Sequence, residues 1–284
     1  FKNNERLKDE DLELIAAQIN LTKSNKASIN LFMNELKKIY QSFGYNNVKI
    51  KFSEKFNKKN NTSDVYFDID EGELTKINRI IFNSNNLVSD QVIRQIIKSQ
   101  TKTIRNIFAN NNFKPELVER DKYTIINYYK NSGYIDVSID TKIEYLKSNR
   151  VNIYFNIKEG TLYSLSSIEI DDANKIISNN TLNKINDKIE IFLLENKIYS
   201  TDKIKTFEKI ITSLLLENDL DYFAVNSFEK KHIDNVDILF QILPITPKYT
   251  NQINIIGNTR TFDHVIRREL EIVEGDAIYE NQIK

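Results

Sequence analysis

Hydrophobic and polar residues alternate in several short stretches of the chain. Segments 77–82 ("INRIIF") and 251–256 ("NQINII") show this alternation, and a period of two predicts half-buried β-strands. After the first of them the period lengthens to three and four, which predicts a short helix with one apolar face. That face consists of Val92, Ile93, Ile96 and Ile97.

A longer helical pattern comes next, and it occurs three times. One copy begins near Pro115, a residue that suits the first turn of a helix. The apolar positions of the three copies are Ile29, Phe32, Leu36 and Ile39, then Val118, Ile125, Ile126 and Tyr129, then Ile204, Phe207, Ile211 and Leu214. Gly44 and Gly133 follow the first two copies, where a positive φ helps to end a helix, and alternating strands follow both glycines.

The order of these patterns repeats along the chain. Segments 40–50 ("YQSFGYNNVKI") and 129–139 ("YKNSGYIDVSI") are nearly the same. Segments 65–82, 151–170 and 236–258 also align with one another. Self-similarity at a fixed period, here about 85 to 89 residues, indicates tandem modules.

We therefore expect an α+β fold made of small modules in the order strand, helix, helix, strand, strand. Each module would be a three-stranded mixed sheet covered by two helices. The predicted boundaries are 1–72, 73–160, 161–247 and 248–284. The first module would keep only the last residue of its opening strand, and the fourth would have only its first strand and one helix.

Composition excludes several classes of protein. The 40 basic and 40 acidic side chains give a formal net charge of zero, so no global field attracts nucleic acid. The chain has no cysteine, which excludes disulfides and thiolate chemistry. No run of about 18 apolar residues predicts a membrane-spanning helix. Because the sequence begins at Phe1 without Met and stops within a repeat, we expect a fragment of a longer protein.

Candidate catalytic and metal-binding groups are few. His232 lies in a charged turn and His264 on the polar face of a predicted helix, so both are expected to be solvated surface residues. The acidic pairs at 70–71 and 171–172 are better explained as turn residues than as metal ligands. The segment 255–260 ("IIGNTR") lacks the glycines and lysine of a phosphate-binding loop. The sequence therefore predicts no catalytic residue, no metal and no cofactor.

Two stretches resemble a known family. Residues 253–279 ("INIIGNTRTFDHVIRRELEIVEGDAIY") and 103–134 ("TIRNIFANNNFKPELVERDKYTIINYYKNSGY") resemble the fifth and third POTRA (polypeptide-transport-associated) domains of the BamA family. BamA proteins are the central subunits of the bacterial outer-membrane barrel assembly machine. By their order, residues 1–72 resemble the second domain and 161–247 the fourth.

This resemblance implies that the closing strand of each module lies at the centre of its sheet. The strand after each Gly-Tyr would then be an edge strand, with unpaired peptide groups that can accept an incoming strand. In the first module Val48, Ile50 and Phe52 would face the helices and Asn47, Lys49 and Lys51 the solvent. In the second, Val137 and Ile139 would face inward and Asp136, Ser138 and Asp140 outward. The residues alone favour a different interpretation, in which the charges only prevent aggregation at the edge, and it is the resemblance that favours strand addition.

The function implied by the resemblance is that of a non-enzymatic receptor and scaffold at the periplasmic face of the bacterial outer membrane. Its expected partners are unfolded outer-membrane barrel proteins, accessory lipoproteins and a C-terminal membrane barrel of the same chain. One alternative is a structural spacer and lipoprotein scaffold without client contact. Another is the POTRA array of an autotransporter-assembly or two-partner secretion protein.

Overall fold

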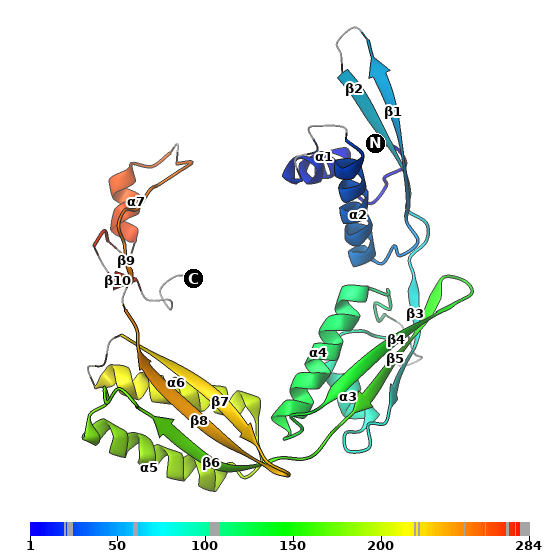
Figure 1. Ribbon diagram of the computed structural model, residues 1–284. Helices are drawn as coiled ribbons and strands as arrows, with labels where there is room; N and C mark the ends of the chain where they lie inside the picture. Colours follow the sequence, from blue (N-terminus) through cyan, green and yellow to red (C-terminus); the bar gives the residue numbers. More distant parts are fainter. Residues whose placement is uncertain are drawn as a thin grey trace. The chain divides into compact units, whose positions relative to one another are not determined.

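The computed structural model describes residues 1–19, 21, 25–58, 62–102, 108–218, 220, 222–246, 248–258, 260–270, 273–275 and 277–278. The chain divides into two compact units, Phe1–Leu162 and Tyr163–Lys284. Each unit contains small sheets with helices packed against them (Figure 1).

Residues 76–158 form one complete module of the predicted kind. Its elements are β3 (Lys76–Asn83), α3 (Asp90–Ile96), α4 (Pro115–Asn131), β4 (Ser138–Leu146) and β5 (Arg150–Lys158). The strand order is β3-β5-β4, with β5 parallel to β3 and antiparallel to β4. The last strand of the module therefore lies at the centre of a mixed sheet, as expected.

The central strand β5 supplies the middle of the hydrophobic core. Its apolar residues Val151, Ile153, Phe155 and Ile157 alternate with polar ones and are almost fully buried. Val118, Ile125 and Tyr129 of α4 and Ile93 of α3 belong to the same buried cluster. Burying an aliphatic or aromatic side chain of this size stabilises the fold by about 1.5–3 kcal/mol, so this one strand contributes much of the core.

The first part of the chain has a related arrangement. It comprises α1 (Asp9–Gln18), α2 (Lys26–Phe43), β1 (Lys49–Asn57) and β2 (Thr62–Asp70). β1 and β2 are antiparallel, and Lys2 forms a parallel bridge with Asp68 on the far side of β2. Lys2 thus occupies the position of the last residue of the opening strand, which is the only part of that strand that the first module was expected to keep.

The predicted helix faces are correct in most positions, but Ile126 in the middle of α4 is only half-buried, and two residues near helix ends also differ. The buried residues of α2 are Ile29, Phe32, Leu36 and Tyr40, while Ile39 is only half-buried. In α6 (Thr201–Glu217) Leu215 is buried where Leu214 was expected. In both helices the step of four residues continues the buried stripe, because the step of three turns the side chain away from it. α2 ends at Gly44, whose φ of 104° is left-handed.

The second unit contains another complete sheet. Its elements are β6 (Ser164–Asp171), α5 (Asn179–Glu195), α6, β7 (Phe223–Lys231) and β8 (Asn235–Pro244). The order β6-β8-β7, with β8 parallel to β6 and antiparallel to β7, repeats that of the preceding module. Val236, Ile238, Phe240 and Ile242 of β8 are fully buried in the same way as their counterparts in β5.

The end of the chain differs from the expectation. It contains β9 (Lys248–Tyr249), α7 (Asp263–Glu269) and a paired two-residue strand, β10 (Ala277–Ile278). Segment 251–256, predicted as a strand, has no strand conformation in the structure. Alternation alone does not make a strand, because the backbone N–H and C=O groups need a neighbouring strand to bond with.

A buried tyrosine–glutamate pair recurs in the first two modules. Tyr40 Oη donates to Glu71 Oε1 over 3.0 Å, and Tyr129 Oη donates to Glu159 Oε1 over 2.9 Å. Burial, and then the carboxylate partner, raise the pKa of both tyrosines above the ordinary value of about 10. In the third module the corresponding positions are Leu215 and Pro244, so both members of the pair are replaced together.

A cluster of hydrogen bonds joins the first two modules within the first unit. Asn149, in the β4–β5 turn, donates from Nδ2 to the Glu73 carbonyl over 2.6 Å. Its Oδ1 accepts from Asn47 Nδ2 (2.7 Å) and from Thr75 Oγ1 (3.0 Å). The φ of Asn149 is 50°, a left-handed value that asparagine tolerates better than most residues. The Asn149 side chain therefore links Asn47, which precedes β1, to residues 73–75 between the first two modules and to the β4–β5 turn of the second sheet.

We predict that the double variant Tyr40→Phe/Tyr129→Phe loses about 1–3 kcal/mol of unfolding free energy at neutral pH, because each glutamate loses a donor. A raised tyrosine pKa contributes stability that is present below about pH 10 and is lost as pH rises further. The variant should therefore lose less stability than the wild type between about pH 8 and about pH 11. Urea unfolding at both pH values tests this. The control is Tyr123→Phe, at a residue that is 61% exposed. The prediction would be contradicted if the double variant lost as much unfolding free energy as the wild type between the two pH values.

We further predict that Asn149→Gly uncouples the first two modules while keeping the left-handed turn, because glycine accepts a positive φ but has no amide. The lost hydrogen bonds correspond to about 1–3 kcal/mol of coupling. Residual dipolar couplings of residues 1–72 and 73–160 should then require two alignment tensors instead of one. Asn83→Ala, which removes an Asn83–Asn156 bond within one sheet, should leave a single tensor.

Candidate functional site: open strand edges

β1 and β4 are both edge strands. β4 is the outer strand in the order β3-β5-β4, and β1 is paired only with β2 among the described residues. In an antiparallel pair, alternate residues direct their N–H and C=O groups away from the partner strand. Each edge therefore presents a row of peptide groups that can bond to another extended chain.

The predicted edge residues fall partly inside these strands. Lys49, Ile50, Lys51 and Phe52 belong to β1, and Ser138 and Ile139 belong to β4. Asn47, Val48, Asp136 and Val137 precede the strands, so their assignment to strand positions is wrong. The turn after the preceding helix takes up these residues, and the Asn47 amide is engaged with Asn149.

The predicted orientations hold in most positions. Val48 and Ile50 are buried while Asn47, Lys49 and Lys51 are exposed, and Val137 and Ile139 are buried while Asp136, Ser138 and Asp140 are exposed. Phe52 is the exception, because it is 39% exposed. Its cross-strand partner Phe67 is covered by the rings of Phe32 and Phe1, at centroid distances of 4.9 and 5.6 Å. Phe52 lies one strand further out and is only partly covered.

The outer face of β1 carries a row of lysines. Lys49, Lys51 and Lys55 are exposed and lie directly opposite Asp70, Asp68 and Asp64 of β2. Opposite charges at facing positions of an antiparallel pair stabilise it by about 0.2–1 kcal/mol each. The lysines therefore fix the register of the hairpin and also line its open edge.

The outer face of β4 is a mixed polar network. Asn152 Nδ2 and Tyr154 Oη of β5 donate to Glu144 Oε2 over 2.8 and 2.7 Å, and Asn78 of β3 donates to Asn152 over 2.9 Å. The bonds from Asn152 and then Tyr154 lower the pKa of Glu144. The network joins all three strands and keeps β4 in register against β5.

The opposite edge of the same sheet is obstructed. Arg94 of α3 donates from Nη2 to the Ile80 carbonyl of β3 over 2.7 Å, and its guanidinium lies 5.2 Å from the centre of the Phe82 ring. The start of β3 is covered by residues 111–113, which form backbone hydrogen bonds to Thr75 and Ile77. β3 therefore offers fewer free peptide groups than β4.

The same arginine contact recurs near the end of the chain. Arg267 Nη2 donates to the Ile253 carbonyl over 2.7 Å. Arg267 and Ile253 each lie 173 residues after Arg94 and Ile80, so the pair is part of the repeat. The contact was not predicted from the sequence, because the carbonyl that the arginine binds is a backbone group.

A third open edge was not predicted. β7 is the outer strand of the sheet β6-β8-β7. The sequence signal was absent because the third module has Asp219-Leu220 where Gly-Tyr marks the others, and Asp219 lies outside the described residues. The helix-side face of β7 is polar, since Ser227 Oγ donates to Glu208 Oε2 over 2.9 Å and Glu229 accepts from Tyr199. The β7 edge therefore differs from β1 and β4 in the polarity of its helix-side face.

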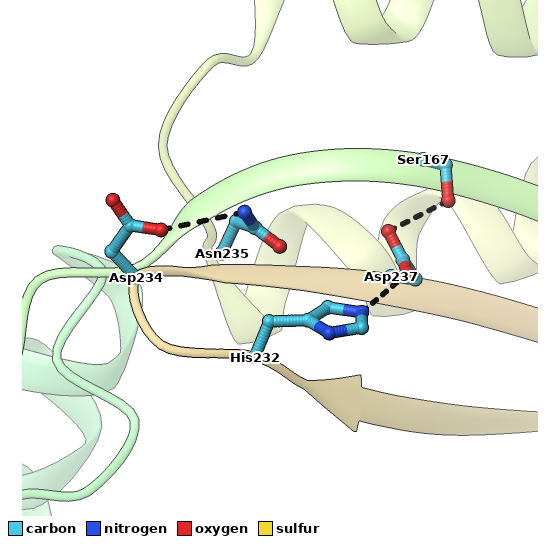
Figure 2. Close-up of polar contacts among 5 residues, drawn as sticks. All are labelled: Ser167, His232, Asp234, Asn235 and Asp237. Atoms are coloured by element: carbon cyan, nitrogen blue, oxygen red, sulfur yellow. Dashed lines mark hydrogen bonds and ion pairs between the residues drawn. The ribbon is translucent and has the colours of Figure 1, made fainter.

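Figure 2 shows a polar cluster at the turn between β7 and β8. His232 Nε2 lies 2.7 Å from Asp237 Oδ2, and Ser167 Oγ donates to Asp237 Oδ1 over 2.8 Å. The contacts from His232 and then Ser167 lower the pKa of Asp237. Ser167 bonds to the carboxylate and not to the imidazole, so the group lacks the serine–histidine contact of a nucleophilic site. His232 is exposed, as expected of a surface residue, but its ring also contacts the Asp237 carboxylate.

The other candidate groups behave as turn residues. Asp172 accepts hydrogen bonds from the backbone of Ile176 and Ile177 at 3.0 and 2.9 Å, and Glu71 accepts one from Arg6 N at 2.8 Å. Within the described ranges no three His, Asp or Glu side chains gather as a metal ion would require. Among the helices described, none is long and apolar enough to cross a bilayer.

Comparisons with known proteins agree with this architecture. A family model described as "POTRA: Surface antigen variable number repeat" matches residues 75–160. The chain is 28% identical over 227 residues to the outer membrane protein assembly factor BamA of Neorickettsia risticii, covering 78% of this chain and 30% of that protein. The corresponding protein of Neisseria meningitidis serogroup B is 26% identical over 257 residues, covering 88% and 31%. The chain thus spans about a third of the length of these relatives.

A solved structure shares the fold. The crystal structure of Haemophilus influenzae BamA POTRA3-5 superimposes with a TM-score of 0.54 at 23% identity, covering 74% of this chain and 82% of that chain. The repeated strand order, the POTRA model that matches residues 75–160 and the two relatives lead to one conclusion: residues 75–160 form a POTRA domain, and the chain is similar to the POTRA region of BamA outer membrane protein assembly factors.

Proposed function

We propose that the chain is the periplasmic receptor region of an outer-membrane protein assembly factor. It binds unfolded barrel proteins by strand addition and docks accessory lipoproteins, without catalysing a reaction. The observation that carries the proposal is the asymmetry of the second sheet, where β4 is open and β3 is obstructed by Arg94 and residues 111–113.

Strand addition suits a receptor for many different sequences, because the peptide backbone is common to all of them. Each backbone hydrogen bond contributes a net of about 0.5–1.5 kcal/mol, and ordering the client offsets part of this gain. A single edge therefore binds weakly. Several edges on one chain raise the effective concentration and allow a client to be held and then released.

One observation favours the alternative of a spacer and lipoprotein scaffold without client contact. The lysines of β1 are the kind of charged residue that prevents edge-to-edge aggregation. In that case β1 and β4 would be protected surfaces and would not accept a strand. The two functions differ in whether an extended peptide binds the edges.

We predict that a ten-residue peptide with the alternating pattern of a barrel strand binds the 1–284 chain with a Kd of about a millimolar. Amide shifts should appear in residues 49–57 and 138–146 when the peptide is titrated into labelled protein. A peptide of the same composition with proline at alternate positions is the control, because proline cannot donate to a strand ladder. Shifts confined to the helices, or equal binding of the proline peptide, would contradict strand addition.

We also predict that Arg94→Ala exposes a second acceptor edge, because the Ile80 carbonyl loses its guanidinium donor. Peptide-induced shifts should then extend to residues 80–83 of β3, where the wild type shows none. The matched control is Arg120→Ala, at an exposed arginine of α4, which should leave the shift pattern unchanged. If Arg94→Ala gives the wild-type pattern, the arginine does not protect this edge.

A further inference from the structure

We infer that the β1 edge selects extended segments that carry acidic residues on one face and aromatic or aliphatic residues on the other. This inference rests on the proposed strand addition and names the chemistry of the partner at one of its edges. It follows from the two faces of β1, which differ from those of the other open edges.

The outer face of β1 sets the charge of the partner. Lys49, Lys51 and Lys55 are exposed on it, and among the described residues the acidic side chains that face them across the strand pair come from β2. A strand added at the open edge places its own outward side chains about 4.5–5.5 Å from these lysines, measured between Cβ atoms. Acidic residues there extend the alternation of charges across a third strand, while lysine or arginine would meet like charges. Because side chains alternate with a period of two in either direction, a parallel and an antiparallel partner are selected alike.

The helix-side face of β1 sets the apolar half of the pattern. Figure 1 shows the β1–β2 hairpin continuing past the N-terminal end of α2. On this face Phe52 and Phe56 are 39% and 57% exposed, with Glu54 between them. An added strand brings its own inward side chains against these two rings and removes apolar surface from water.

The exposed rings distinguish a binding edge from a merely protected one. Lysines on an edge strand prevent aggregation by themselves. Exposed aromatic residues on the same strand promote association, so a strand built only for protection would not carry Phe52 and Phe56. Lysines together with rings indicate an edge that rejects most strands and accepts those with matching charge.

The other two edges do not share this chemistry. The outward residues of β4 include Asp140, Lys142 and Glu144, which are mixed in sign, and Glu144 already accepts two hydrogen bonds from β5. The outward residues of β7 include Phe228, which is 51% exposed, and Lys230. Each edge therefore serves as an internal comparison for β1 within one protein.

The test uses the 1–284 chain and two ten-residue peptides with identical apolar positions, one with glutamate and one with lysine at the alternate positions. We expect the β1 amides to show about tenfold tighter binding of the glutamate peptide at low salt, from three favourable pairs. This preference should shrink at high salt because the charges are exposed. The β4 amides should show less than about a twofold preference.

The variant Lys49→Thr/Lys51→Thr/Lys55→Thr should lose the preference at β1, because threonine keeps a high strand propensity without charge. The amide signals of β2 in this variant report whether the hairpin is intact. If the hairpin is disrupted, the salt dependence of the preference in the wild type tests the role of the charges instead. Equal binding of both peptides at β1, or the same preference at β4, overturns this inference and leaves strand addition standing. If the β1 amide signals shift with protein concentration in the absence of peptide, the edge binds a second copy of the chain, and this result also overturns the inference. If neither peptide binds any edge, both the inference and the proposed function fail.

Discussion

The burial of one strand at the centre of each three-stranded sheet is the constraint on which the rest of the structure depends. β5 and β8 are apolar on one face, with residues such as Phe155 and Phe240 fully buried under helices. Each must also bond its backbone on both sides, to a parallel neighbour and to an antiparallel one. Once the last strand of the module takes this place, the strand before it in the chain is left at the edge.

The two edges of a sheet are not equivalent, and the helices cause the difference. α3 brings Arg94 to the carbonyl of Ile80 in β3. The segment before α4 covers the start of β3 as well. β3 therefore has fewer free peptide groups than β4, the outer strand at the other edge of the same sheet.

The repeat preserves the architecture while it varies the chemistry. The tyrosine–glutamate pair of the first two modules is replaced in the third by Leu215 and Pro244, two apolar residues that cannot form this hydrogen bond. Replacing both members avoids an unsatisfied buried carboxylate, which is the costly case. The outer faces of the edge strands vary more, from the lysines of β1 to the mixed charges of β4, because they do not face the hydrophobic core.

The sequence by itself determined the modules, their element order and most inward-facing positions, because periods of two and of three to four directly record which face is buried. Tertiary structure decided what depends on contacts between distant residues. Segment 251–256 alternates like a strand but has no strand partner, and Phe52 has the right parity but lies beyond the cover that Phe32 gives to Phe67. The Arg94 contact and the Asn149 junction bond to backbone carbonyls, which are present at every residue and leave no mark in the pattern of side chains.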